Sequence, residues 1–333
     1  MKVAVLSPVA WRTPPRHYGP WEQMASNLTE GLVAAGLEVT LFATGDSVTT
    51  AVLNSVVEKG YEEDRSQDAK VLECLHISNL MERAGEFDLI HNHFDFLPLS
   101  YSGLIKTPLI TTIHGFSSER IIPVYQKYND TGHYVSISDA NRHPLLNYLG
   151  TVYNGLNSEE FDFKPAGDGY LLFFGRIHPD KGTAEAIQIA LKSKRKLIIA
   201  GIIQDENYFK EKVEPFLGDE VVFIGSAGPE KRNELLGAAY ALLHPINFAE
   251  PFGLSVAEAM LCGTPVIAFN KGSMPELIED TKTGFLVDST DEAITAVAEI
   301  GNIDRSYCRE WALTKFSKEK MVDDYLALYQ QIL

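Results

Sequence analysis

The sequence is poor in cysteine and contains no long uninterrupted apolar run. Three cysteines occur among 333 residues, and Cys74, Cys262 and Cys308 form no spaced motif. A disulfide framework is therefore not expected. No apolar run approaches the ~18 residues of a membrane-spanning helix, and Met1–Pro8 is too short and too soon broken for a signal peptide. These features predict a cytoplasmic protein without a membrane span.

Positive charge is also scarce. The net charge is −16, and residues 1–150 hold 17 acidic side chains against 11 lysines and arginines. Proteins that bind nucleic acids or anionic membranes rely on clustered lysine and arginine. The charge balance therefore argues against a nucleic-acid partner and against adhesion to a membrane surface.

Short apolar runs alternate with segments of helical periodicity along the whole chain, a pattern that predicts an α/β fold with parallel sheets. Turn-rich segments near 153–157 and 164–169 mark a boundary. We expect two doubly wound, Rossmann-like domains, 1–155 and 156–317, facing each other across a cleft at the carboxyl ends of their strands. The last helix, 318–333, is expected to pack back onto the first domain. Residues 46–70 are polar and weakly patterned and are interpreted as a loop or a frayed segment.

The expected strands and helices follow from these runs. The predicted strands are 3–9, 39–43, 88–91, 109–113 and 134–137 in the first domain, and 170–175, 197–201, 221–225, 241–244, 266–269 and 285–287 in the second. Helices are expected from residue 20 to Gly36, over 71–84, and near residues 188, 210, 234, 258 and 296.

The stretch Glu250-Pro-Phe-Gly-Leu-Ser-Val-Ala-Glu258 carries the most chemistry. It predicts a loop with an acid at its start, followed by a helix that carries a second acid. The backbone N–H groups at such a helix N-terminus, from Phe252, Gly253 and Leu254, donate hydrogen bonds. Acids that accept hydrogen bonds from hydroxyls, beside amides that donate them, suit a sugar.

A second loop supplies positive charge. Phe174-Gly-Arg-Ile-His-Pro-Asp-Lys-Gly182 follows the first predicted strand of the second domain, and it places Arg176 and Lys181 five residues apart before a helix. Two fixed cations and a helix N-terminus are able to hold a diphosphate and stabilise its charge as it departs. An exposed pair of surface cations is the alternative.

Together these segments resemble glycosyltransferase family 4, whose members have the GT-B fold and transfer sugars from nucleotide donors with retention of anomeric configuration. Gly175-Arg176, Lys181-Gly182 and the two glutamates eight residues apart are similar to the signature of that family. The segments Gly263–Ile267, Gly272–Glu276 and Thr283–Leu286 also resemble those that follow the signature.

The resemblance implies roles in the second domain. Arg176 and Lys181 would bind the donor diphosphate. Glu250, with the N–H groups of Phe252, Gly253 and Leu254, would bind the donor sugar. Glu258 would hold the ribose of the nucleotide, since a carboxylate accepts two hydrogen bonds from a vicinal diol.

In the first domain the resemblance places His114, at the end of Thr111-Thr-Ile-His-Gly115, beside the reacting sugar. It would thus be catalytic together with Arg176, Lys181 and Glu250. A histidine with a purely structural role at the strand edge is the alternative. Gly19 would approach the donor and Glu22 the acceptor, although Pro20 lacks the N–H that the family's glycine-rich turn supplies. Nearby Arg12, Arg16 and His17 would compensate for that loss or contact the acceptor, and ordinary loop residues are the alternative.

Metal and cofactor are not expected. His91-Asn-His93 superficially suggests a metal site, but two histidines without a third ligand are a weak zinc pattern. The sequence contains no Asp-x-Asp, the metal clamp of the other sugar-transferase fold. The cationic loop would take the place of the ion.

The resulting hypothesis is a retaining hexosyltransferase that uses a UDP- or GDP-sugar and a hydroxylated, soluble acceptor. No acid in the matched motifs is an obvious nucleophile, so attack from the leaving-group face is favoured. A sugar-nucleotide epimerase, a phosphate-dependent glycoside phosphorylase and a noncatalytic sugar-binding subunit are alternatives. An NAD-dependent oxidoreductase is disfavoured because neither domain has Gly-x-Gly-x-x-Gly after a strand.

Overall fold

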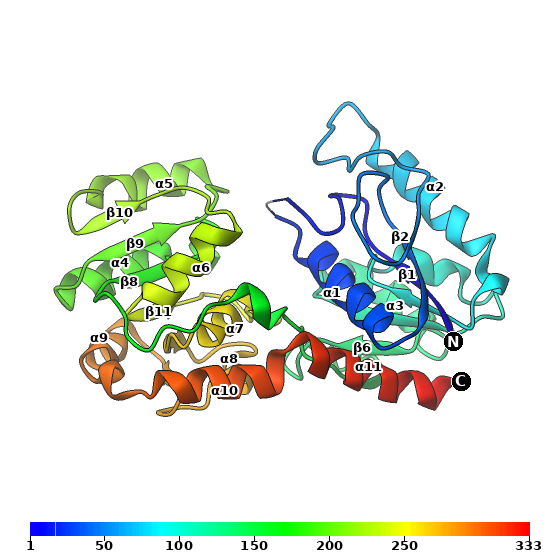
Figure 1. Ribbon diagram of the computed structural model, residues 1–333. Coiled ribbons are helices and arrows are strands. Elements are labelled where there is room, and N and C mark those ends of the chain that lie inside the picture. The colour runs from blue at the N-terminus through cyan, green and yellow to red at the C-terminus, as the bar shows by residue number, and fades with distance from the viewer. Residues whose placement is uncertain (17) are drawn as a thin grey trace. The chain divides into compact units, whose positions relative to one another are not determined.

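The structure is a computed structural model that describes residues 1–16 and 18–333. The chain forms two compact units (Figure 1). Unit 1 comprises Met1–Leu156 together with Lys318–Leu333, and unit 2 comprises Asn157–Ser317. Among the helices of the described residues, none is both long enough and apolar enough to cross a membrane.

Unit 1 is built on a seven-stranded parallel sheet with the order β3-β2-β1-β4-β5-β6-β7. Its strands are β1 (Lys2–Leu6), β2 (Glu38–Phe42), β3 (Val52–Asn54), β4 (Leu89–Asn92), β5 (Leu109–Ile113), β6 (Tyr134–Ser136) and β7 (Tyr148–Thr151). Its α-helices are α1 (Pro20–Ala34), α2 (Ala69–Met81), α3 (Ile122–Lys127) and α11 (Lys318–Ile332), with 3-10 turns η1 (Ala84–Glu86), η2 (Leu97–Tyr101) and η3 (Glu119–Ile121).

Both faces of this sheet are buried, as a doubly wound fold requires. Side chains alternate along a strand, so Val3 and Val5 of β1 enter one core whereas Ala4 and Leu6 enter the other. The first core is closed by apolar residues of α1 and α11, namely Ala25, Leu28, Leu32, Met321, Val322, Tyr325 and Tyr329. The second is closed by α2 and α3, through Ile77, Leu80 and Tyr125. Helix α11, the last of the chain, thus completes a core that the first 156 residues leave open.

Unit 2 holds a six-stranded parallel sheet with the order β10-β9-β8-β11-β12-β13. The strands are β8 (Leu171–Phe174), β9 (Leu197–Ala200), β10 (Val221–Phe223), β11 (Ala241–His244), β12 (Val266–Phe269) and β13 (Gly284–Val287). The helices are α4 (Thr183–Lys192), α5 (Glu206–Lys212), α6 (Pro229–Ala238), α7 (Leu254–Leu261), α8 (Met274–Leu277), α9 (Thr290–Glu299) and α10 (Arg305–Phe316), with 3-10 turns η4 (Ser158–Glu160), η5 (Pro179–Lys181), η6 (Glu214–Phe216) and η7 (Ile300–Asn302).

The strand order of each sheet reverses direction once. In unit 2 the chain runs outward from β8 to β10 and then resumes on the other side of β8 with β11. In unit 1 the same reversal separates β1 from β4. The two loops that follow such a strand pair diverge to opposite faces, and ligands of open α/β sheets bind in the crevice between them. The loops after β8 and β11 are therefore where a ligand of unit 2 is expected.

The predicted fold class, two Rossmann-like parallel sheets, is confirmed, and several elements differ in detail. The predicted strand 3–9 ends at Leu6. Val9 is buried in the following loop, so its apolar side chain did not mark a strand residue. The segment 46–70 contains the short strand β3, and α2 begins at Ala69, where the Asp68 side chain accepts a hydrogen bond from Lys70 N at 2.9 Å. Strand β7 and helix α10 were not predicted.

Unit 1 is predicted to depend on α11 for its stability. Tyr325 is 2% exposed in the core and hydrogen bonds Thr112 Oγ1 at 2.6 Å. Tyr325→Ala is expected to lower the free energy of unfolding by about 3–5 kcal/mol, since it leaves a large cavity. Gln330→Ala, an exposed position of the same helix, is the control for urea unfolding. Equal stability of the two variants would contradict this role of α11.

Candidate functional site

The loop after β11 carries the first predicted acid. Glu250 begins a segment that ends at Gly253, which has φ 94° and precedes the first residue of α7, Leu254. The N–H groups of the first turn of a helix have no carbonyl partner within that helix. Ser273 holds this loop from the other side, because its N–H donates to Glu250 O at 3.0 Å and its hydroxyl donates to Phe252 O at 2.6 Å. The predicted donors Phe252, Gly253 and Leu254 thus lie together at the start of α7.

The loop after β8 carries the predicted cations. Arg176 lies two residues after the end of β8 and donates a hydrogen bond to Gln204 Oε1. Lys181 lies at the end of the 3-10 turn η5, immediately before Gly182 and α4. Gly182 has φ 73°, and a Cβ atom there would meet Pro245 O at 1.9 Å. Glycine at this position therefore allows the loops after β8 and β11 to touch.

An ion pair joins the two loops. Lys181 Nζ donates to Glu250 Oε2, and the side chains are only 15% and 12% exposed. The ammonium also lies 4.7 Å from the ring centroid of Phe248. A backbone hydrogen bond also joins the two loops, since the N–H of Asn247 donates to Asp180 O at 2.7 Å. The sequence-predicted Lys181 and Glu250 are therefore brought together at the switch point of the sheet.

Glu250 is a permanent carboxylate in this environment. Burial by itself favours the neutral acid. The His244 ring, whose Nε2 lies 3.7 Å from Oε2, and the Lys181 ammonium, which donates to Oε2, outweigh it and lower the pKa of Glu250 to about 2. An ionised carboxylate only accepts hydrogen bonds. Glu250 is thus suited to receive hydroxyl donors across the whole physiological pH range.

Glu258, the second predicted acid, is engaged by a cation that sequence analysis missed. It lies on α7, is 7% exposed, and pairs through Oε1 with Arg232 Nη1 of α6 at 3.1 Å. Burial raises the pKa of Glu258, and the Arg232 charge opposes that rise. Arg232 also pairs with Glu160 at 3.4 Å and lies 5.0 Å from the ring centroid of Phe161. No motif marked Arg232, because its contact with Glu258 joins two different helices, and the residues are 26 positions apart in the chain.

His114 lies in unit 1 among other buried aromatic rings. It is 8% exposed, follows β5, and stacks on Trp21 with ring centroids 5.7 Å apart. Its Nε2 lies 2.9 Å from His93 Nδ1. Burial lowers the pKa of His114 to about 3, so the ring is neutral at physiological pH. His114 can therefore offer a hydrogen bond or a lone pair, but it carries no charge.

His91, which shares a sequence motif with His93, has both ring nitrogens occupied. Nδ1 lies 2.6 Å from the Tyr329 hydroxyl of α11, and Nε2 lies 2.7 Å from Thr112 Oγ1. Within residues 1–16 and 18–333, no group of three or more histidine, cysteine or acidic side chains is placed to hold a metal ion. The His91 side chain accordingly ties the sheet of unit 1 to α11.

The loop after β1 holds the remaining predicted residues. Gly19 has φ 153° and caps α1, and Glu22 is 3% exposed, with Oε1 accepting Trp11 N at 3.3 Å. Arg16 pairs with Asp46 at 3.1 Å and Glu63 at 2.7 Å. Arg12 donates to the carbonyl of the residue two further on, Pro14, at 2.8 Å. His17 lies outside the described residues.

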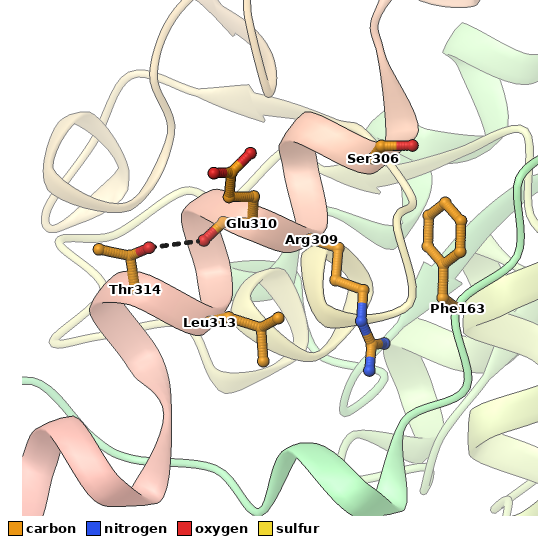
Figure 2. A pocket seen from close by; sticks show the side chains of 6 residues that line it. All are labelled: Phe163, Ser306, Arg309, Glu310, Leu313 and Thr314. Atoms are coloured by element: carbon orange, nitrogen blue, oxygen red, sulfur yellow. Dashed lines mark hydrogen bonds between the residues drawn. The ribbon is translucent and has the colours of Figure 1, made fainter.

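A shallow hollow elsewhere in unit 2 is not part of this arrangement. Its volume is about 240 Å³, and it lies along α10 (Figure 2). The Arg309 guanidinium there donates to the carbonyls of Phe161 at 2.8 Å and Leu261 at 2.5 Å, and Thr314 Oγ1 donates to Glu310 O. The residues that line it are Phe163, Ser306, Arg309, Glu310, Leu313 and Thr314. Arg309 and Thr314 of this hollow are thus engaged in hydrogen bonds with the backbone of unit 2.

Comparison with protein families gives two matches that together extend over most of the chain. Residues 22–160 match the model described as "Glycosyltransferase Family 4". Residues 157–307 match the model described as "Glycosyl transferases group 1". The two matches meet close to the boundary between the compact units.

Similar proteins include several glycosyltransferases. An uncharacterised glycosyltransferase of Methanocaldococcus jannaschii is 24% identical over 335 residues, covering 86% of this chain and 85% of the relative. A D-inositol 3-phosphate glycosyltransferase of Streptomyces avermitilis is 25% identical and covers 81% of this chain and 72% of its own. A phosphatidyl-myo-inositol mannosyltransferase of Mycolicibacterium smegmatis is 26% identical and covers 75% and 70%.

Solved structures share the fold. AviGT4, a glycosyltransferase involved in avilamycin A biosynthesis, aligns with a TM-score of 0.74 at 24% identity, covering 100% of this chain and 98% of its own. Sucrose-phosphate synthase of Thermosynechococcus elongatus aligns at 0.80 and 18% identity, covering 100% and 99%. HepE of Anabaena, solved with UDP-glucose, aligns at 0.74 and 19% identity, covering 99% and 100%.

The buried Glu22 is predicted to make stability depend on pH. Burial raises its pKa from 4.5 to about 7, so the folded state favours the protonated acid. That stabilisation is complete below pH 4.5 and is lost as the pH rises through 7. Relative to Glu22→Gln, the wild type should lose about 3 kcal/mol of unfolding free energy between pH 4.5 and 8.

Urea unfolding of both proteins across this pH range measures the effect. Glu38→Gln, at an exposed position of β2, is the control. A stability difference between wild type and Glu22→Gln that stays constant with pH would show that Glu22 keeps an ordinary pKa in the folded protein.

Proposed function

We propose that this chain, which belongs to glycosyltransferase family 4 and is a glycosyltransferase, moves a hexosyl unit from a UDP- or GDP-sugar to a hydroxyl of a soluble acceptor, with retention of anomeric configuration and without a metal ion. The observation that carries the proposal is the buried ion pair between Lys181 and Glu250, at the switch point of the unit 2 sheet. This pair supports the proposal because it joins a cation suited to a diphosphate to a carboxylate suited to hydroxyl hydrogen bonds.

The diphosphate is assigned to the loop after β8. Arg176 and Lys181 both follow β8, and the first turn of α4 comes immediately after Gly182. The Arg176 guanidinium donates to the neutral amide oxygen of Gln204 near the surface. A phosphate oxygen, which carries negative charge, can replace that acceptor with a stronger hydrogen bond. These cations would stabilise the negative charge that develops on the leaving group.

The sugar and the ribose are assigned to the two acids. Glu250, permanently ionised, would accept hydrogen bonds from the donor sugar, beside the N–H groups of Phe252, Gly253 and Leu254. Glu258 would hold the ribose through the carboxylate oxygen that does not pair with Arg232. The complex of HepE with UDP-glucose supports a nucleotide-sugar donor. The similarity to a mannosyltransferase supports a hexose as the transferred sugar.

The chemical step is a front-face substitution. The bond from the anomeric carbon to the phosphate oxygen breaks, and the acceptor oxygen bonds to the same face of the sugar. The acceptor proton passes to the departing phosphate oxygen. Catalysis would then rest on positioning and on leaving-group stabilisation, with the neutral His114 of unit 1 contacting the reacting sugar.

The acceptor is assigned to loops of unit 1, where Glu22 would contact it. Gly19, in the same loop, would contact the donor. Arg16 is already paired with Asp46 and Glu63, and Arg12 bonds the backbone. An anionic acceptor group would have to compete with two carboxylates for Arg16. This arrangement favours a neutral, hydroxylated acceptor.

Removal of the Lys181 charge is predicted to abolish most turnover. Lys181→Met should lower kcat/KM for the nucleotide sugar by about 10²–10³, the usual effect of deleting one group that stabilises transition-state charge. Lys192→Ala removes an exposed lysine of α4, 59% exposed, and should leave the rate unchanged. Melting curves verify folding of both variants.

The assay uses UDP- and GDP-hexoses with a panel of hydroxylated acceptors, in excess EDTA. NMR of the product anomer is expected to match the donor. Donor conversion without acceptor would identify an epimerase, and a requirement for inorganic phosphate would identify a phosphorylase. Full activity of Lys181→Met would refute the site.

A further inference from the structure

His244 is a buried side chain beside the proposed donor site that neither the motifs nor the proposed function uses. It is the last residue of β11 and is 6% exposed. Its Nε2 lies 3.7 Å from Glu250 Oε2, the same oxygen that receives Lys181 Nζ. Within the described part of the chain, this Nε2 is buried and has no hydrogen-bond partner.

A buried nitrogen without a partner is unfavourable, because it has lost its hydrogen bonds to water. The distance from Nε2 to Glu250 Oε2 exceeds the upper limit of an N–H···O hydrogen bond, about 3.2 Å, by about half an ångström. An imidazole Nε2–H is a donor, and the Glu250 carboxylate can accept from several directions at once. His244 is therefore placed to bind Glu250 after a small movement of that side chain.

Donor binding supplies a reason for such a movement. On the proposed function, the diphosphate brings negative charge to Lys181, which at present contacts Glu250. The ammonium must then be shared between phosphate and carboxylate. A buried carboxylate is strongly destabilised when its interaction with a cation weakens, unless another hydrogen-bond donor compensates. The charged groups acting on the His244 ring are Glu250 and Lys181.

We propose that His244 is a positioning residue that donates a hydrogen bond to Glu250 when Lys181 contacts the donor diphosphate. Its Nε2–H would hold Glu250 Oε2, which keeps the carboxylate directed at the hydroxyls of the donor sugar. His244 itself touches neither the sugar nor the phosphates. The inference rests on the proposed function and names a residue that sets how firmly the sugar is held.

The test compares two substitutions. His244→Phe keeps the size and the apolar contacts of the ring but removes the donor, whereas His244→Gln places an amide N–H near the former Nε2. His244→Phe should lower kcat/KM for the nucleotide sugar by about 10- to 100-fold, the effect of losing one charge-assisted hydrogen bond. His244→Gln should restore most of that loss.

Two further measurements separate positioning from a structural role. Calorimetric titration with UDP or GDP, which lack the sugar, should give the wild-type Kd for both variants. The acid limb of the kcat/KM profile should shift to higher pH in His244→Phe alone, because Glu250 then lacks a donor when Lys181 is engaged.

The outcomes are distinct. Wild-type kcat/KM and pH profile in His244→Phe would overturn the inference while leaving the proposed function intact. Equal loss of nucleotide binding in both variants would show a structural role and would also overturn it. A wild-type protein that binds neither UDP nor GDP and transfers no sugar would instead refute the proposed function.

Discussion

The buried ion pair between Lys181 and Glu250 is the constraint around which unit 2 is organised. Two charges removed from water are unfavourable unless they contact each other closely, and the loops after β8 and β11 are shaped to allow that contact. Gly182 admits the carbonyl of Pro245, and Gly272, with φ 56°, lies where a Cβ atom would meet Glu250 N at 2.3 Å. The proposed donor site is thus held in place before any ligand arrives.

Unit 1 is held by a different buried polar system. His91 bonds both the Thr112 hydroxyl of β5 and the Tyr329 hydroxyl of α11, and Tyr325 bonds Thr112 in turn. A fully bonded buried network fixes one arrangement of its members. Because α11 comes from the end of the chain, this network secures the C-terminal segment against the sheet on which His114 lies.

The sequence was sufficient where the information is local. Apolar periodicity predicts the parallel sheets, and the motifs around Lys181 and Glu250 predict two residues that the structure brings into contact. Strand β7 is short and only half-buried, so its apolar pattern is weak. His244 and Arg232 were missed because their importance depends on neighbours across the fold, Glu250 and Glu258. Assigning Glu258 to the ribose also overlooked Arg232, the cation with which it pairs.

The central claim is that Glu250 binds the sugar of the donor while Lys181 binds its diphosphate. It is tested most directly by calorimetric titration of wild type and Glu250→Gln with UDP, GDP and their glucose and mannose conjugates. The account predicts that the wild type binds one conjugate more tightly than its free nucleotide, and that Glu250→Gln loses this increment while it still binds the nucleotide. An undiminished increment in Glu250→Gln would contradict the account.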